Sequence, residues 1–166
     1  MVIFNLADVM FLSLFALICV QMKRMATPSP ALAYAFLCTV SSVVMLFALS
    51  DLLWLIAAFR PERDANLLVL LNDMAWITFA APVGLFCALC FFLGIGILLD
   101  ACPQPVFAAW VAWFNFAIAA VTLPAALSAV TLDGPLAWDG AISFTLRWLA
   151  FALYIVVMFL VSRRAI

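Results

Sequence analysis

The sequence contains little charge and no histidine. Of its 166 residues, 9% are charged and 71% are apolar, and 7 Lys and Arg nearly balance 8 Asp and Glu. An average soluble domain carries about 25% charged residues, so this composition excludes a soluble globule and indicates a chain surrounded largely by lipid. It also excludes a nucleic-acid binder with a basic face, a secreted disulfide scaffold and a disordered tail.

The absence of histidine excludes several kinds of chemical site. Haem ligation through His, most catalytic zinc sites, the membrane di-iron oxygenases and the Ser-His-Asp hydrolases all need an imidazole. No Walker A lysine motif is present, and Gly94-Ile95-Gly96 lacks the third Gly and the loop of a dinucleotide fingerprint. The sequence therefore predicts no cofactor, no metal site and no catalytic residue.

Five apolar stretches are long enough to cross a bilayer, which takes about 20 helical residues. They cover residues 3–22, 31–59, 67–99, 106–130 and 141–161. The longest connection, residues 131–140, has ten residues and leaves no room for a soluble domain. We therefore predict an all-α polytopic transmembrane helical bundle that forms a single domain over residues 1–166.

Two prolines fall inside the predicted spans. Pro82 and Pro124 each remove a backbone donor and should kink their helices, which lipid permits where neighbours satisfy the freed carbonyl. The stretch 67–99 is longer than the bilayer is thick, so we expect its first turns to lie at the interface or the helix to tilt.

Basic residues set the predicted orientation. Four of them follow the first and fifth stretches: Lys23, Arg24, Arg163 and Arg164. Arg60 and Arg63 lie on the opposite side, so the positive-inside rule places the N-terminus outside and the C-terminus in the cytoplasm. A cleavable signal peptide is the alternative for residues 3–22, but its charges follow the apolar run and Asp8 interrupts it.

Short motifs spread over nearly the whole chain carry a family resemblance. They are Gln21-Met22-Lys23-Arg24, Ser29-Pro30, Phe59-Arg60-Pro61-Glu62-Arg63-Asp64, Leu71-Asn72-Asp73, Gln104-Pro105-Val106-Phe107, Gly134-Pro135, Ala137-Trp138 and Arg163-Arg164. Together they resemble a group of uncharacterised bacterial integral membrane proteins. The resemblance implies six spans and no particular activity. With the odd number of spans here, it leads us to expect that residues 1–22 are the second helix of a longer design.

Ionisable side chains inside the spans are costly, at about 2.5–3.5 kcal/mol each at a helix centre. Four fall there: Asp8, Asp51, Asp73 and Arg147. Counting helix rise from the predicted span ends puts all four about 8–12 Å below the outer boundary. A buried guanidinium keeps its proton and needs a counter-charge, so we hypothesise that Arg147 pairs with at least one of the carboxylates. Asn72, beside Asp73, can add hydrogen bonds.

This predicted cluster allows three interpretations. The first is a structural clamp that fixes helix register without chemistry, because buried ion pairs often specify packing alone. The second is a site for a solute or a proton. The third is that the charges reach the interface along their own side chains, which is easiest for Arg147.

Cys87 and Cys90 form a C-x-x-C motif well inside the third stretch. In a thioredoxin-like setting this spacing lowers a thiol pKa at a helix N-terminus, but here the motif lies away from both water faces. Packing is the favoured interpretation, and a membrane thiol redox role is the alternative.

The sequence thus predicts a multi-pass protein of the bacterial inner membrane. We expect a non-enzymatic membrane subunit or scaffold with a structural polar clamp in its outer leaflet. The alternative is a small transporter or a solute- or lipid-binding bundle that uses the carboxylates and Arg147. The expected partners are the lipid bilayer and either other membrane subunits or a second copy, without nucleic acid.

Overall fold

The computed structural model describes residues 2–60, 62–80, 82–131 and 133–165, and the side chains of residues 2–9 and of Ala129 lie outside this description. Over these ranges the chain is helical and forms no strand. The helices are α1 (Val2–Arg24), α2 (Ala31–Phe59), α3 (Ala65–Ala80), α4 (Val83–Leu98), α5 (Ala109–Thr122), the 3₁₀-helix η1 (Leu123–Ala129), the π-helix η2 (Ala141–Leu146) and α6 (Arg147–Arg164). The predicted all-α class is confirmed.

Four described segments are long and apolar enough to cross a membrane, which makes the chain a multi-pass membrane protein. They are Ala31–Phe59, Ala65–Leu98, Ala109–Ser128 and Ala141–Arg164. The first predicted stretch, residues 3–22, falls within α1, whose first side chains lie outside the described residues. Large apolar side chains are exposed on every one of the spanning helices, as expected for helices that face lipid as well as protein.

The two internal prolines reshape their segments in different ways. At Pro82 the predicted third stretch divides into two helices, because α3 ends at Ala80 and α4 begins at Val83. Pro124 instead lies in the first turn of η1, where α5 tightens into a 3₁₀-helix. A proline at the start of a helix loses no hydrogen bond, so the change of helix type accommodates it.

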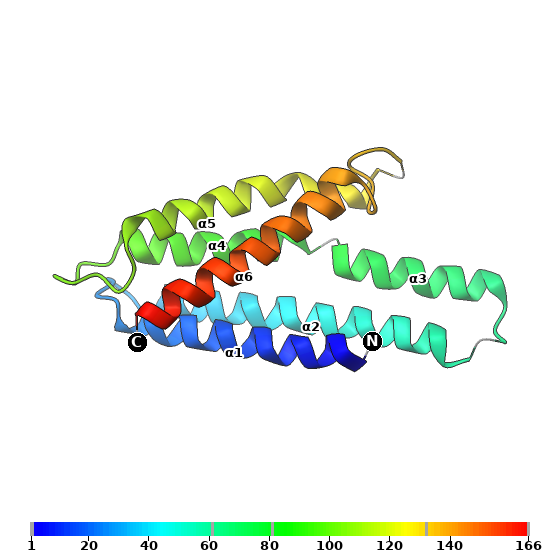
Figure 1. The fold of residues 1–166 in the computed structure, drawn as a ribbon, viewed down its shortest axis with the longest axis horizontal. Helices are drawn as coiled ribbons and strands as arrows, with labels where there is room; N and C mark the ends of the chain where they lie inside the picture. The colour runs from blue at the N-terminus through cyan, green and yellow to red at the C-terminus, as the bar shows by residue number, and fades with distance from the viewer. Residues whose placement is uncertain (1, 61, 81, 132, 166) are drawn as a thin grey trace.

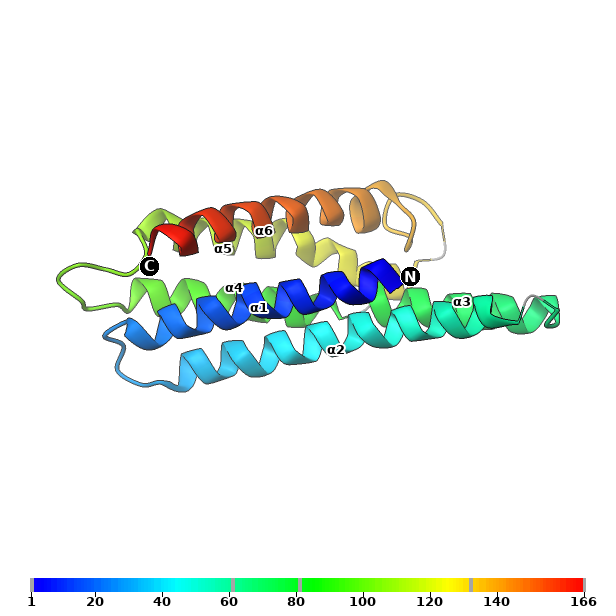
Figure 2. The same ribbon diagram turned by 60° about the horizontal axis from the view of Figure 1, so that its bottom comes forward.

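The helices run roughly along one direction, and α2 and α3 lie side by side as an antiparallel pair (Figures 1 and 2). We call residues 51–80 the α2–α3 hairpin. In both views this hairpin extends past the ends of α5 and α6 that lead into the η1–η2 connection. It is therefore the least covered part of the fold.

Tyr154 anchors α6 in the core. Its fully buried ring contacts Phe86 of α4 with centroids 5.4 Å apart, and Phe15 of α1 and Phe114 of α5 at 6.2 and 6.3 Å. Aromatic pairs at these separations add to the packing energy of their buried area. One side chain of α6 thereby fixes the distances to three other helices.

Asp100 joins two loops at the end of the bundle where α1 and α4 finish. Its Oδ1 accepts hydrogen bonds from the backbone N–H groups of Ala26 at 2.9 Å and Cys102 at 3.1 Å, and its Oδ2 accepts one from Val106 at 3.1 Å. Burial raises the pKa of Asp100, but the donated hydrogen bonds outweigh it and hold that pKa below its ordinary value.

Candidate functional site

Arg147 binds the end of a broken helix. It is the first residue of α6, directly after the π-helix η2, and its Nη1 donates a hydrogen bond to the Ala80 carbonyl oxygen at 3.0 Å. Ala80 is the buried last residue of α3. The last carbonyls of a helix have no partner within the helix and carry its negative end charge. Arg147 therefore supplies both a donor and a positive charge where the break at Pro82 exposes an acceptor.

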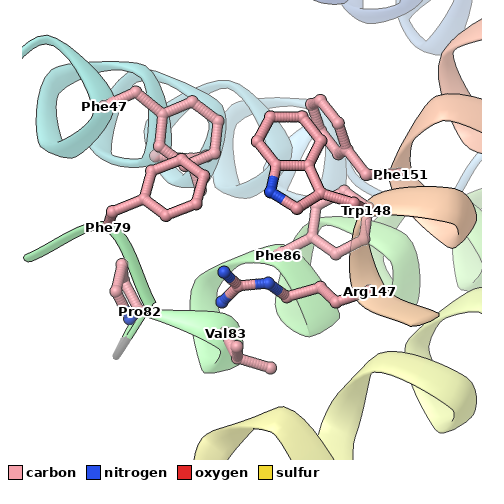
Figure 3. Close-up of a pocket in the computed structure, with 9 residues that line it drawn as sticks. Phe47, Phe79, Pro82, Val83, Phe86, Arg147, Trp148 and Phe151 are labelled. Carbon is pink, nitrogen blue, oxygen red and sulfur yellow. The ribbon is translucent and has the colours of Figure 1, made fainter. Parts of the chain in front are cut away.

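A partly open cavity of about 40 Å³ surrounds the guanidinium (Figure 3). Its lining comes from α2, α6 and both sides of the α3–α4 break: Val43, Phe47, Phe79, Pro82, Val83, Phe86, Arg147, Trp148 and Phe151. Arg147 is the charged member of this set, and its Nη2 is buried without a hydrogen-bond partner in the described part of the chain. We call this cavity the Arg147 pocket.

Aromatic rings position the guanidinium. Its central carbon lies 5.2 Å from the centroid of the Phe79 ring, within the range of a cation–π contact. Phe79 in turn stacks on Trp148 with centroids 5.6 Å apart and contacts Phe47 at 5.1 Å. Because these rings come from α2, α3 and α6, the Arg147 side chain is held where three helices meet.

Among the described residues, the acceptor that Arg147 bonds is a backbone carbonyl and not a carboxylate. Among the described residues, no ion pair joins Arg147 to an acidic side chain. Asp51 is buried on α2 and takes part in interactions of its own, whereas Asp73 is exposed on α3. The side chain of Asp8 lies outside the described residues, so its pairing with Arg147 stays a prediction.

Asn72 has a different partner from the one expected. Its Oδ1 accepts a hydrogen bond from the Trp54 Nε1 at 3.3 Å, which ties α3 to α2 within the hairpin. The same pair of helices is joined by Trp54 and Trp76, whose ring centroids are 4.9 Å apart. Asn72 is therefore part of the hairpin and not of the Arg147 pocket.

The predicted common depth of the four ionisable residues depended on predicted span ends. Along α3, Asp73 precedes Ala80 by seven residues, which corresponds to about 10 Å of helix. Asp73 therefore lies well away from Arg147 along the bundle, toward the tip of the hairpin. The depth estimate assumed that all spans end at the same level. It misplaced Asp73 because α2 and α3 extend further than the helices beside them.

Two groups that contact Arg147 were missed by sequence reasoning, namely the Ala80 carbonyl and the Phe79 ring. Pro82 was the signal that could have located them. A proline that breaks a helix in lipid leaves carbonyls on the preceding turn, and a polar side chain from another helix must satisfy them.

The C-x-x-C motif packs between α4 and α5. Cys87 Sγ donates to the Ala119 carbonyl oxygen at 3.5 Å and lies 3.7 Å from Thr122 Oγ1, while Cys90 is fully buried. Both thiols are free. This geometry agrees with the packing interpretation.

Comparison with known protein families, characterised proteins and solved structures finds no significant match for this chain. The resemblance to bacterial integral membrane proteins thus remains an expectation drawn from the motifs alone. A proposal for the function therefore rests on the geometry of the described residues.

Proposed function

We propose that the protein is a non-enzymatic membrane subunit whose α2–α3 hairpin docks against a transmembrane helix of a different chain. The observation that carries this proposal is the exposure of Asp73 within an apolar face of α3. Of the 16 residues of α3, two alanines are buried. Eight of the 16 are exposed, so one face of this helix is available to a partner.

The exposed face of α3 has the spacing of a helix–helix seam. Asn66, Leu70, Asp73 and Ile77 are all exposed and follow one another at intervals of four, three and four residues. Residues at these intervals lie on one face of a helix. Isolated polar residues in such an apolar seam fix the register and the choice of partner in paired helices.

Neither lipid nor water suits this face on its own. In lipid, an exposed Asp73 without a polar partner would be costly, by up to about 2.5–3.5 kcal/mol at a bilayer centre and less toward the interface. In water, the side chains of Leu70 and Ile77, which are 53% and 59% exposed, would form part of a large apolar patch. A partner helix that carries a basic or hydrogen-bond-donating side chain satisfies both requirements.

The charge of Asp73 favours a different chain over a second copy. Two copies related by a two-fold axis through this seam would bring Asp73 against Asp73, and like charges in a low-dielectric interface are unfavourable. A heterologous helix with a donor opposite Asp73 has no such conflict. The second copy is therefore an outcome that the crosslinking test must exclude.

The Arg147 contact gives the hairpin a fixed base. Ala80 ends α3, and its bond to Arg147 ties the base of the hairpin to α6 across the break at Pro82. This is the polar clamp of the proposed subunit, although its acceptor is a backbone carbonyl. A docking helix needs such a rigid base because a loosely hinged helix loses conformational freedom on binding.

Site-specific photo-crosslinking tests the proposed subunit. A benzophenone side chain at Ile77 should yield one defined adduct with a second, different chain in the membranes of the native host. The adduct should disappear with Asp73→Leu and persist with Asp139→Leu, which removes an exposed acidic residue of the η1–η2 connection. A self-dimer, or the same adduct from Val156 on exposed α6 surface, would contradict the proposal.

For the orientation, we propose an outside N-terminus and a cytoplasmic C-terminus in a bacterial inner membrane. Lys23, Arg24, Arg163 and Arg164 support it because α1 and α6 finish at the same end of the bundle. Arg24 Nη1 donates to the Ala165 carbonyl oxygen at 2.6 Å across this end. A periplasm-active reporter fused after the last residue should stay silent, and an active reporter would reverse the orientation.

The buried, unpartnered Nη2 of Arg147 favours a second candidate function, a lipid- or solute-binding bundle. This second function does not depend on the α2–α3 hairpin. Its ligand class follows from the chemistry of the pocket.

A further inference from the structure

We infer that the Arg147 pocket binds the oxyanion head, a carboxylate or a phosphate, of a membrane amphiphile. Among the described residues that line the pocket, Arg147 is the one charged group, and it has hydrogen-bonding capacity left over. An anionic head supplies the acceptor and the negative charge, and an acyl chain supplies contacts for the apolar walls. This site is separate from the docking face of α3.

The guanidinium retains donors that face the cavity. Arginine has five N–H groups, and the described structure uses Nη1 for the Ala80 carbonyl oxygen at 3.0 Å. Nη2 is buried and lacks a partner among the described residues. Figure 3 shows both terminal nitrogens between the α3–α4 break and the aromatic rings. A buried charged donor without an acceptor is costly, so an anion at this position is stabilised.

The walls select an amphiphile over a hydrophilic anion. The other lining residues are Val, Pro, Phe and Trp side chains, and Phe47, Phe86 and Phe151 contribute ring surface to the walls. A freely soluble anion would exchange its hydration shell for a single cation and apolar walls. An amphiphile that already lies in the membrane loses less hydration and gains contacts for its chain.

The cavity volume limits what part of the ligand enters. A single water requires about 10–15 Å³ measured in this way, so a cavity of about 40 Å³ admits only a few non-hydrogen atoms. A head of this size, bound through two oxygens to the guanidinium, fits that limit. The chain would leave through the open side of the pocket, next to Trp148, whose side chain is 37% exposed.

The competing occupant is a carboxylate of the protein itself. Asp8, the acidic residue of α1, is one of the three carboxylates of which we expect at least one to pair with Arg147, and its side chain lies outside the described residues. The test must therefore separate a bound amphiphile from Asp8. An Asp8→Asn variant does so, because it removes the internal carboxylate and leaves the pocket lining unchanged.

The experiment measures equilibrium binding to the purified protein in uncharged detergent micelles. The probes are oleate and oleyl phosphate, oleyl alcohol with the same chain and no charge, and acetate and inorganic phosphate with the charge and no chain. We expect oleate or oleyl phosphate to bind at least about tenfold more tightly than oleyl alcohol, a difference of roughly 1.4 kcal/mol. We expect acetate and phosphate alone to bind weakly. This comparison uses the unaltered chain and does not depend on the folding of a variant.

Two arginine variants then test which positive charge binds the anionic head. Arg147→Gln should weaken oleate binding by about tenfold or more, whereas Arg163→Gln, which removes an exposed cation of the same helix, should leave it unchanged. Equal binding of oleate and oleyl alcohol would overturn the inference, as would equal losses in the two variants. Tight binding of acetate or phosphate alone would replace the amphiphile with a soluble anion. Binding that appears only in Asp8→Asn would show that Asp8 occupies the site.

Discussion

Arg147 and Ala80 are joined by a 3.0 Å hydrogen bond from the guanidinium to a backbone carbonyl, across the point at which the membrane-spanning segment Ala65–Leu98 is broken. In water such a carbonyl would be solvated. In lipid only protein groups can donate a hydrogen bond to it, and Arg147 at the start of α6 is that donor for Ala80 at the end of α3. The same arginine also faces the pocket, which links the packing of the helices to the site.

The hydrogen bond between Trp54 and Asn72 should stabilise the hairpin. Trp54→Phe keeps a ring on α2 but removes the donor, and we expect a loss of about 0.5–1.5 kcal/mol in the free energy of unfolding. Trp113→Phe is the matched control, since Trp113 is 63% exposed and its described contact is a ring contact with Phe116. Unfolding by a denaturing detergent measures both variants. Equal losses would show that the hydrogen bond contributes nothing.

Gly94 should be intolerant of a side chain because of the close approach of α5. A Cβ atom at this position would lie 2.5 Å from the Phe116 ring, so Gly94→Ala should destabilise the protein by about 1–3 kcal/mol. Gly84 lies in the same helix, and a Cβ atom there would have no neighbour within 4 Å, so Gly84→Ala should be neutral or stabilising by up to about 1 kcal/mol. Thermal unfolding in detergent compares the two variants, and a reversed order would contradict the packing of α4 on α5.

Asp100 should make the free energy of unfolding fall at acid pH. Its pKa is lower in the folded protein than in the unfolded chain, so it stabilises the fold above the unfolded value of about 3.9. That contribution is lost as the pH falls from there through the folded-state pKa. The side chain is largely solvated, so the effect should remain below about 1 kcal/mol.

Unfolding measured between pH 6 and pH 3 checks this contribution. Asp100→Asn should flatten the decline that the unaltered protein shows at the acid end. Asp64→Asn is the comparison, because Asp64 is an exposed carboxylate in the loop between α2 and α3. A decline of the same size in all three proteins would exclude Asp100 as its source.

The helical class and the position of a distortion at Pro82 could be predicted because both depend on local chemistry, although the sequence predicted a kink there and the structure has two separate helices. Twenty apolar residues in succession have few alternatives to a membrane helix, and Pro82 cannot continue the helix that precedes it. The partner of Arg147 could not be predicted in the same way. The search for a partner of Arg147 considered only charged side chains. The acceptor at Ala80 is a backbone carbonyl, and it is free to accept only because the helix ends there.

The prediction that the acidic residues share one depth depended on the offset between helices along the bundle, which the sequence does not specify. Helix rise gives distance along one helix, but the offset between helices is set by how they pack. Here α2 and α3 pair through Trp54, Asn72 and Trp76 and extend past the helices beside them. Asp73 accordingly lies toward the hairpin tip, and its exposure became the basis of the proposed docking face.

The most direct test of the Arg147 clamp is a double-mutant cycle with Arg147→Leu and Pro82→Ala, measured as free energies of unfolding in detergent. In the unaltered protein Arg147→Leu should cost about 2–3 kcal/mol, because it leaves the Ala80 carbonyl without its charged donor. With alanine at position 82 the helix can continue and a backbone N–H can serve that carbonyl, so the cost should fall below about 1 kcal/mol. If the two substitutions were additive within about 0.5 kcal/mol, the clamp at the helix break would be contradicted.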